Sequence, residues 1–154
     1  MDAKKKRSEK PDLDLDLLPG LIGYQLRLAQ IAIFRDFNSS VGALDVSPGL
    51  FGVLVIIDAN AGLTQNALAK ATHLDRSTVV TVIDKLEERG LVQRRAAVPD
   101  RRAYALVLTP DGVKLVRKLK TLVREHESRL CANLSNQERE QLVRLLQRIF
   151  PELR

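Results

Sequence analysis

The segment between Ser77 and Gly112 constrains the fold more than any other part of the chain. It reads STVVTVIDKLEERGLVQRRAAVPDRRAYALVLTPDG. Its first part has the apolar spacing of a helix, which ends at Gly90. Two short alternating stretches, Leu91–Arg95 and Ala103–Leu108, predict a hairpin, and Thr109-Pro110 is a typical helix start. We therefore expect a helix, a β-hairpin and a new helix in that order.

The hairpin region is strongly basic. From Arg89 to Arg102 there are five arginines and one acidic residue, a net charge of +4 over fourteen residues. A helix followed by a basic hairpin is how a winged helix-turn-helix protein holds DNA, with the helix in the major groove and arginines in the narrow minor groove. A solubilising surface hairpin is the alternative. The candidate DNA-binding residues here are Arg94, Arg95, Asp100, Arg101 and Arg102.

The helix before the hairpin is preceded by a shorter one. A helix capped by Thr64 is expected to run to about Ala71, and a tight connection leads to a cap at Asp75 or Ser77. Helix-turn-helix proteins present the start of the second helix to base edges. A capped surface helix with small polar residues is the alternative. The candidate DNA-binding residues here are Thr64, Gln65, Arg76, Ser77, Thr78, Thr81 and Lys85, opposite an inward face of Val79, Ile83 and Leu86.

Four further helices complete the expected fold, which is mainly α with a small β-hairpin wing. One runs from about Leu17 to Val41, and another opens at Ser47-Pro48 and ends before Asn60. The last two begin at Thr109-Pro110 and at the capping box of Ser135 and Glu138. The predicted organisation is a disordered tail (1–12), an N-terminal dimerisation helix (13–46), a winged helix-turn-helix DNA-binding domain (47–109) and C-terminal dimerisation helices (110–154).

Composition is compatible with this fold and excludes several classes. A chain of 154 residues with 45% hydrophobic residues suggests one globular domain with a real core. The net charge of +6 favours polyanionic partners without identifying them. The single cysteine, Cys131, excludes an internal disulfide framework and suits the cytoplasm. The longest apolar run, Leu50–Ile57, is too short to cross a membrane.

Two stretches carry a resemblance to a known family. LTQNALAKATHLDRSTVVTVIDKLEERGLVQRR, followed by DRRAYALVLTPDG, resembles the winged-helix region of the multiple-antibiotic-resistance-regulator (MarR) family. The resemblance covers residues 47–112 closely. It implies an obligate homodimer with interleaved terminal helices, a palindromic operator, and repression relieved by a small anionic or aromatic ligand. It also implies that Arg102 is the arginine at the tip of the wing and Asp100 its partner.

The ligand is suggested by the first third of the chain. The segment GYQLRLAQIAIFRDF, residues 23–37, is similar to the branch of the family that responds to hydroxycinnamic or other aromatic acids, or to their coenzyme A thioesters. The alternatives are that the aromatic residues are ordinary core and that the arginines face solvent. No cofactor is expected beyond such an effector. The candidate ligand-binding residues are Tyr24, Arg27, Phe34, Arg35, Phe37 and Phe51.

Other functions fit the sequence less well. Redox sensing is disfavoured because Cys131 lies late in the chain, and metal sensing because His73 and His126 are isolated in sequence. An enzyme is disfavoured because the chain has no phosphate loop, metal motif or nucleophile with a recognisable base. The acidic residues Asp84, Glu87 and Glu88 are explained by a solvated helix face. An architectural DNA-binding protein without a ligand remains the alternative to a ligand-responsive repressor.

Overall fold

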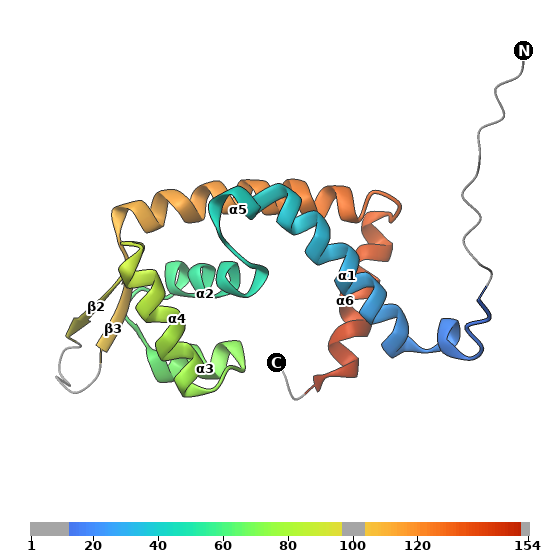
Figure 1. Ribbon diagram of the computed structural model, residues 1–154, viewed down its shortest axis with the longest axis horizontal. Coiled ribbons are helices and arrows are strands. Elements are labelled where there is room, and N and C mark those ends of the chain that lie inside the picture. The colour runs from blue at the N-terminus through green and yellow to red at the C-terminus, as the bar shows by residue number, and fades with distance from the viewer. Residues whose placement is uncertain (1–12, 97–103, 152–154) are drawn as a thin grey trace, which may run out of the picture. The chain divides into compact units, whose positions relative to one another are not determined.

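The computed structural model describes residues 13–96 and 104–151 (Figure 1). This part of the chain contains six α-helices and three short strands. It separates between Ile33 and Phe34 into two compact units, which are described one by one below. The first unit holds a 3-10 turn, Leu18–Gly20, and the first part of α1 (Ile22–Val41). The second holds the end of α1 and then η2 (Gly42–Leu44), α2 (Pro48–Ala59), β1 (Leu63–Thr64), α3 (Gln65–Thr72), α4 (Arg76–Glu88), β2 (Val92–Ala96), β3 (Tyr104–Leu108), α5 (Pro110–Leu130) and α6 (Asn136–Ile149).

The first unit corrects the predicted start of the first helix. The sequence placed that start near Leu17, with Pro19 in the first turn. Pro19 instead lies in the separate 3-10 turn, and Leu21 is extended, with φ −88° and ψ 128°. The side-chain amide of Gln25 donates to the carbonyl of Pro19 at 2.7 Å, which satisfies a group that the interrupted helix leaves free. Apolar spacing alone does not reveal such a break, because the helical spacing of apolar residues continues through the break.

The predicted helix caps of the second unit are confirmed. The hydroxyls of Ser47 and Thr109 each accept a hydrogen bond from the backbone N–H three residues on, at 3.2 Å and 3.0 Å. Ser135 and Glu138 form the reciprocal capping box at the start of α6. Asp75, rather than Ser77, caps α4. Each cap satisfies backbone donors that the first turn of a helix cannot satisfy itself.

The hairpin belongs to a three-stranded antiparallel sheet in the order β1-β3-β2. In the hairpin, Val92 pairs with Leu108 and Ala96 with Tyr104. The sequence did not predict β1, because a strand of two residues shows no alternation. The residue before it, Gly62, has φ +90°, which suits glycine and turns the chain into the sheet.

The core of the second unit lies where α2, α3, α4 and α5 meet the sheet. The inward face predicted for the fourth helix is confirmed, since Val79, Ile83 and Leu86 are all buried. Burial of side chains of this size stabilises the fold by roughly 1.5–3 kcal/mol each. The larger fully buried side chains are Leu54, Ile57, Leu68, Ile83, Leu86, Leu106 and Leu119.

The start of α5 is joined closely to the turn between α4 and β2. Gly90 ends α4 with φ +66°, and its carbonyl accepts the hydroxyl of Thr109 at 2.6 Å. The backbone N–H of Thr109 donates to the carbonyl of Leu91 at 3.0 Å. A Cβ on Gly112 would lie 2.1 Å from that carbonyl oxygen, so the contact requires glycine. We call Gly90, Leu91, Thr109 and Gly112 the α5 joint.

A buried histidine connects the end of α1 to α5. His126, 3% exposed, places Nδ1 2.6 Å from Oδ2 of Asp36, and its ring lies edge-on to Phe37 with centroids 5.6 Å apart. Arg129 donates to Asp36 at 3.2 Å and to Ser40 at 2.5 Å. The hydrogen bond from His126, helped by Arg129, lowers the pKa of Asp36 below its usual value. Sequence spacing left His126 isolated because its partner lies 90 residues earlier.

In the ranges 13–96 and 104–151, no single helix is long and apolar enough to cross a membrane. One bent pair, Ile22–Leu44 with Pro48–Ala59, has the length and composition for it. The second member of this pair is α2, whose residues Val53, Leu54 and Ile57 are buried in the core just described.

Candidate nucleic-acid interface

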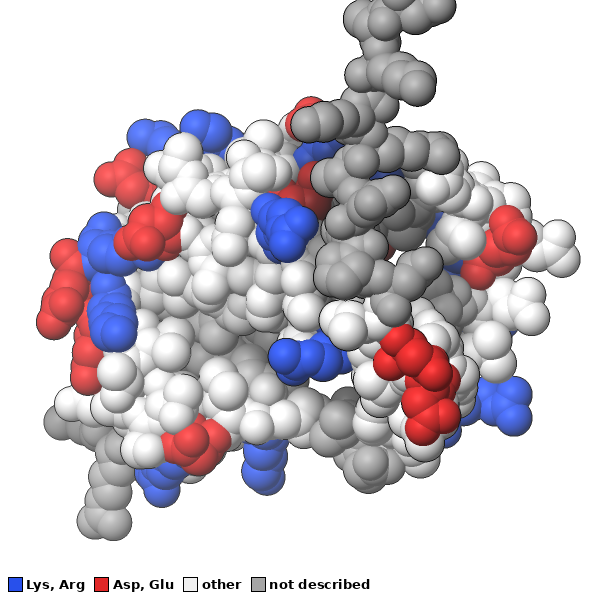
Figure 2. Space-filling view, turned by 45° about the vertical axis from the view of Figure 1, so that its right-hand side comes forward, with Lys and Arg blue, Asp and Glu red and all other residues white. Residues whose placement is uncertain are grey.

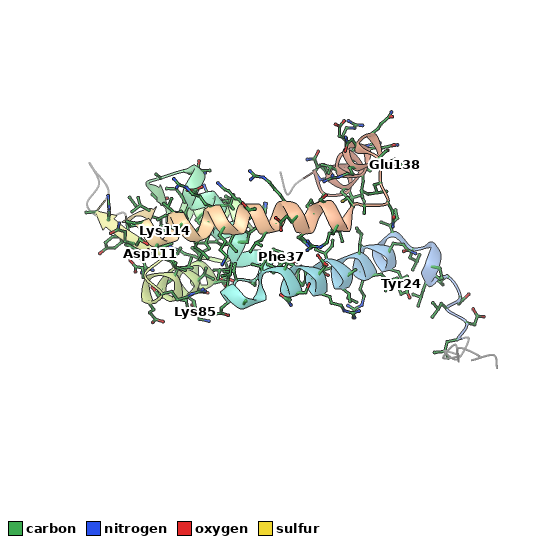
Figure 3. All side chains as sticks on the ribbon, turned by 90° about the horizontal axis from the view of Figure 1, so that it is seen from above. Tyr24, Phe37, Lys85, Asp111, Lys114 and Glu138 are labelled. Atoms are coloured by element: carbon green, nitrogen blue, oxygen red, sulfur yellow. The ribbon has the colours of Figure 1, made fainter. Side chains whose placement is uncertain are left out.

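The start of α4 presents polar side chains on the surface of the helix-turn-helix. His73 ends α3 in the left-handed region, with φ 54°, and turns the chain into α4, which packs against α3. Most of the side chains predicted to contact DNA from α4 are exposed, and Thr78 is half-buried. Lys85 projects from α4 in Figure 3. The exposed members are Arg76, Ser77, Thr81 and Lys85.

Asp75 organises the hydroxyl groups of this surface. Its Oδ1 accepts the backbone N–H of Thr78 at 2.8 Å and the hydroxyl of Ser77 at 2.5 Å. Its Oδ2 accepts the hydroxyl of Thr78 at 2.6 Å. The hydrogen bonds from Ser77 and Thr78 hold the pKa of Asp75 well below its usual range, so the carboxylate is ionised at neutral pH. One turn later, the hydroxyl of Thr81 donates to the carbonyl of Ser77 at 3.1 Å.

Arg94 of β2 is tied to α4 rather than directed outward. Its Nη2 donates to Oδ1 of Asp84 at 2.6 Å, its Nη1 donates to Glu87, and its backbone N–H reaches Oε1 of Glu87 at 2.7 Å. The side chain is 19% exposed. Burial works against its charged form, but the hydrogen bonds to Asp84 and Glu87 outweigh it and raise the pKa of Arg94. The interpretation of Asp84 and Glu87 as a merely solvated face is therefore wrong. We call Asp84, Glu87 and Arg94 the wing clamp.

The start of α3 adjoins the wing clamp. Gln65 is half-buried, and in the amide orientation that satisfies both of its polar groups its oxygen accepts from Nη2 and Nε of Arg94 at 2.9 Å and 3.2 Å. Thr64 caps α3 by accepting the backbone N–H of Ala67 at 3.2 Å. Both side chains thus have partners within the protein. A signal for the clamp is present in the alternation of β2, because Arg94 shares a face with the buried Val92.

The other charged residues considered in the hairpin region divide into three groups. Arg95 is exposed on β2. Arg89, counted with the basic hairpin in the sequence, instead donates to the carbonyls of Leu44 and Asp45 at 3.0 Å and 2.8 Å. The remaining candidates, Asp100, Arg101 and Arg102, lie outside the described residues. Figure 2 shows basic and acidic side chains side by side on the face in view, so total charge alone does not locate a DNA surface there.

The candidate ligand-binding residues are divided between the two units. Tyr24, half-buried, and Arg27, exposed, lie in the first unit. In the second unit, Phe37 is buried and contacts the half-buried Phe51, with ring centroids 6.3 Å apart. The other two residues of that unit, Phe34 and Arg35, are exposed.

Comparisons with known proteins point to one family. The model of the MarR family matches residues 44–103. A putative transcriptional regulatory protein for the hcr operon of Thauera aromatica is 39% identical over 148 residues, which cover 96% of this chain and 89% of that protein.

Two solved structures of the transcriptional repressor CouR are similar over most of the chain. One is bound to a 23-mer DNA duplex and has a TM-score of 0.85 at 36% identity, covering 90% of this chain and 98% of CouR. The other is bound to p-coumaroyl-CoA and has a TM-score of 0.81 at 34% identity, covering 90% and 97%.

A helix-turn-helix pair followed by a hairpin in a three-stranded antiparallel sheet defines the winged helix-turn-helix class of DNA-binding proteins. The comparisons narrow this class. The chain belongs to the MarR family of DNA-binding transcriptional regulators, and it is therefore a regulator rather than an enzyme.

Proposed function

We propose that the protein is a homodimeric repressor of a palindromic operator, released from DNA by an aromatic acid in the form of its coenzyme A thioester. The observation that carries the proposal is that one fold, shared over 90% of the chain, belongs to CouR bound to a DNA duplex and to CouR bound to p-coumaroyl-CoA. Operator contacts come from the start of α4 and from the wing. The wing contacts of Arg102, braced by Asp100, stay a prediction from the sequence.

Dimerisation is supported by apolar surface in the terminal regions 13–46 and 110–154. A chain that leaves many large apolar side chains in water on two separate segments has a surface to bury. In α6, Leu142, Leu145 and Ile149 recur at helical spacing and are 45%, 45% and 42% exposed. The exposed leucines near the other end are Leu13, Leu15, Leu17, Leu18 and Leu21. Ultracentrifugation at low micromolar concentration is expected to show a dimer, and a pure monomer would contradict the proposal.

The proposed ligand site uses aromatic residues for the acyl group and arginines for the anionic end. Phe51 and Phe34 offer partly accessible rings, and Phe37 contacts the ring of Phe51 from the core. Arg35 is exposed and available for charge-assisted bonds to phosphate or carboxylate. Tyr24 and Arg27 of the first unit are the further candidates.

The proposal is tested by selecting duplexes from a random library with the full chain and titrating the best complex with ligands. We expect a palindromic sequence and loss of affinity of about 5-fold to 150-fold with p-coumaroyl-CoA, because couplings of this kind are typically ~1–3 kcal/mol. Free p-coumarate and free coenzyme A serve as controls for the two halves of the ligand. Equal binding to unrelated duplexes indicates an architectural protein instead. If the chain binds its operator selectively but no aromatic compound weakens this binding, the proposed class of ligand is wrong.

A further inference from the structure

The hydroxyl groups at the start of α4 all use their hydrogens within the protein. Ser77 and Thr78 face the carboxylate of Asp75, at 2.5 Å and 2.6 Å. Thr81 faces the carbonyl of Ser77, at 3.1 Å. An ionised carboxylate and a carbonyl oxygen can only accept, so each hydrogen must come from the hydroxyl.

A hydroxyl has one hydrogen and two lone pairs, so each of these groups is left with lone pairs only. The same groups are exposed or half-buried on the helix that faces DNA in the proposed function. Most serines and threonines at a DNA surface serve either as donors or as acceptors. Here the choice is already made by the fold.

We infer that Ser77, Thr78 and Thr81 read DNA as hydrogen-bond acceptors, and that they select the amino groups of adenine or cytosine in the major groove. This inference rests on the proposed function, because it concerns how the same surface reads its operator. In the major groove only adenine N6 and cytosine N4 donate. Guanine O6 and N7, thymine O4 and the phosphate oxygens accept, so they have no partner in these hydroxyls.

The surroundings of the hydroxyls favour bases over phosphates. The carboxylate of Asp75 is exposed, ionised and within 2.6 Å of both hydroxyl oxygens. A phosphate drawn to the same place would meet a like charge at close range, which is unfavourable. Arg76, exposed at the first position of α4, supplies the opposite chemistry and suits guanine. The surface therefore combines a cationic donor with neutral acceptors that have a fixed orientation.

The first test removes single amino groups from the DNA. In the selected operator, each adenine is replaced in turn by purine, and each cytosine by 2-pyrimidinone. We expect one or more positions per half-site at which the affinity falls about 5-fold or more. The same replacement must lower the DNA affinity of the Ser77→Ala or Thr78→Val protein less, because that protein already lacks the accepting hydroxyl. Replacements at positions outside the half-sites control for the weakened base pair.

The second test changes the group that holds the hydroxyls. Asn caps a helix about as well as Asp, so Asp75→Asn is expected to fold normally. Its amide offers one acceptor in place of two, which frees a hydroxyl hydrogen for donation. We expect the preference for amino-bearing bases to weaken in a repeated selection. The matched control is Asp111→Asn in the first turn of α5, which changes the net charge equally and should leave the selected sequence unaltered.

The outcomes separate this inference from the proposed function. If the chain selects no sequence over random DNA, the proposed function fails and this inference with it. If it selects an operator but no amino deletion acts through Ser77, Thr78 or Thr81, the inference alone is overturned. An Asp75→Asn protein with the sequence preference of the unaltered chain overturns it as well.

Discussion

Replacing Arg94 tests whether a hairpin arginine holds the protein together or holds DNA. Arg94→Met keeps an apolar stem and removes the guanidinium. The bond to Asp84, which is 51% exposed, is worth about 0.2–1 kcal/mol, as for surface pairs. The bond to Glu87, which is 32% exposed, is worth roughly 1–2 kcal/mol, because one side is largely shielded and the bond is charge-assisted. The expected loss is therefore about 2 kcal/mol.

The loss is measured by thermal and urea unfolding at one protein concentration, since the stability of the proposed dimer depends on concentration. For a chain of this length, about 2 kcal/mol corresponds to a Tm lower by roughly 4–8 °C. Arg95→Met is the matched control, because Arg95 is the exposed neighbour on the same strand. It should leave the Tm unchanged and make the salt dependence of DNA binding shallower. The wing clamp is refuted if Arg94→Met instead shows this second pattern.

Three further predictions concern other parts of the chain. Gly112→Ala should lower the free energy of unfolding by about 2–4 kcal/mol, because its Cβ would lie 2.1 Å from a carbonyl oxygen. Gly49→Ala, inside α2, meets nothing within 4 Å and should leave the free energy of unfolding unchanged or raise it by up to about 1 kcal/mol, and equal losses in the two variants would contradict the α5 joint. The lowered pKa of Asp36, due first to His126, stabilises the fold above the usual value of 3.8, and this stabilisation is lost as pH falls through the lower folded value. Below pH 5, the Tm of Asp36→Asn should therefore fall less with decreasing pH than the Tm of the unaltered protein. An equal fall in both proteins would count against the pairing of Asp36 with His126. Arg102→Ala should weaken operator binding by about 1–3 kcal/mol with a shallower salt slope, and an unchanged slope would remove it from the interface.

Local signals in the sequence predicted most of the elements. A cap residue acts on the first turn of its own helix, so the caps at Ser47, Thr109 and Ser135 can be predicted without knowledge of the rest of the fold. The inward face of α4 is equally local, because helical spacing alone places its apolar residues together.

The features that were missed depend on partners far away in the sequence or on very short segments. Asp36 and His126 meet across 90 residues, and no periodicity records that. The two residues of β1 are too few to alternate. The positive charge of Arg94 suggested a contact with DNA. Only the packing of β2 on α4 revealed the two carboxylates beside its guanidinium. A sequence gives the charge of a side chain more readily than the direction in which it points.

The α5 joint determines where a chimaera of this protein can be cut. The predicted boundary between the DNA-binding domain and the C-terminal helices falls between residues 109 and 110, inside the joint. A graft ending there would bring a foreign α5 against the carbonyl of Leu91, where any residue but glycine at position 112 collides. The hydroxyl of Thr109, at the fusion point, would also have to keep its hydrogen bond to the carbonyl of Gly90. An exchange of DNA-reading modules between relatives should therefore carry the first turn of α5 with the wing.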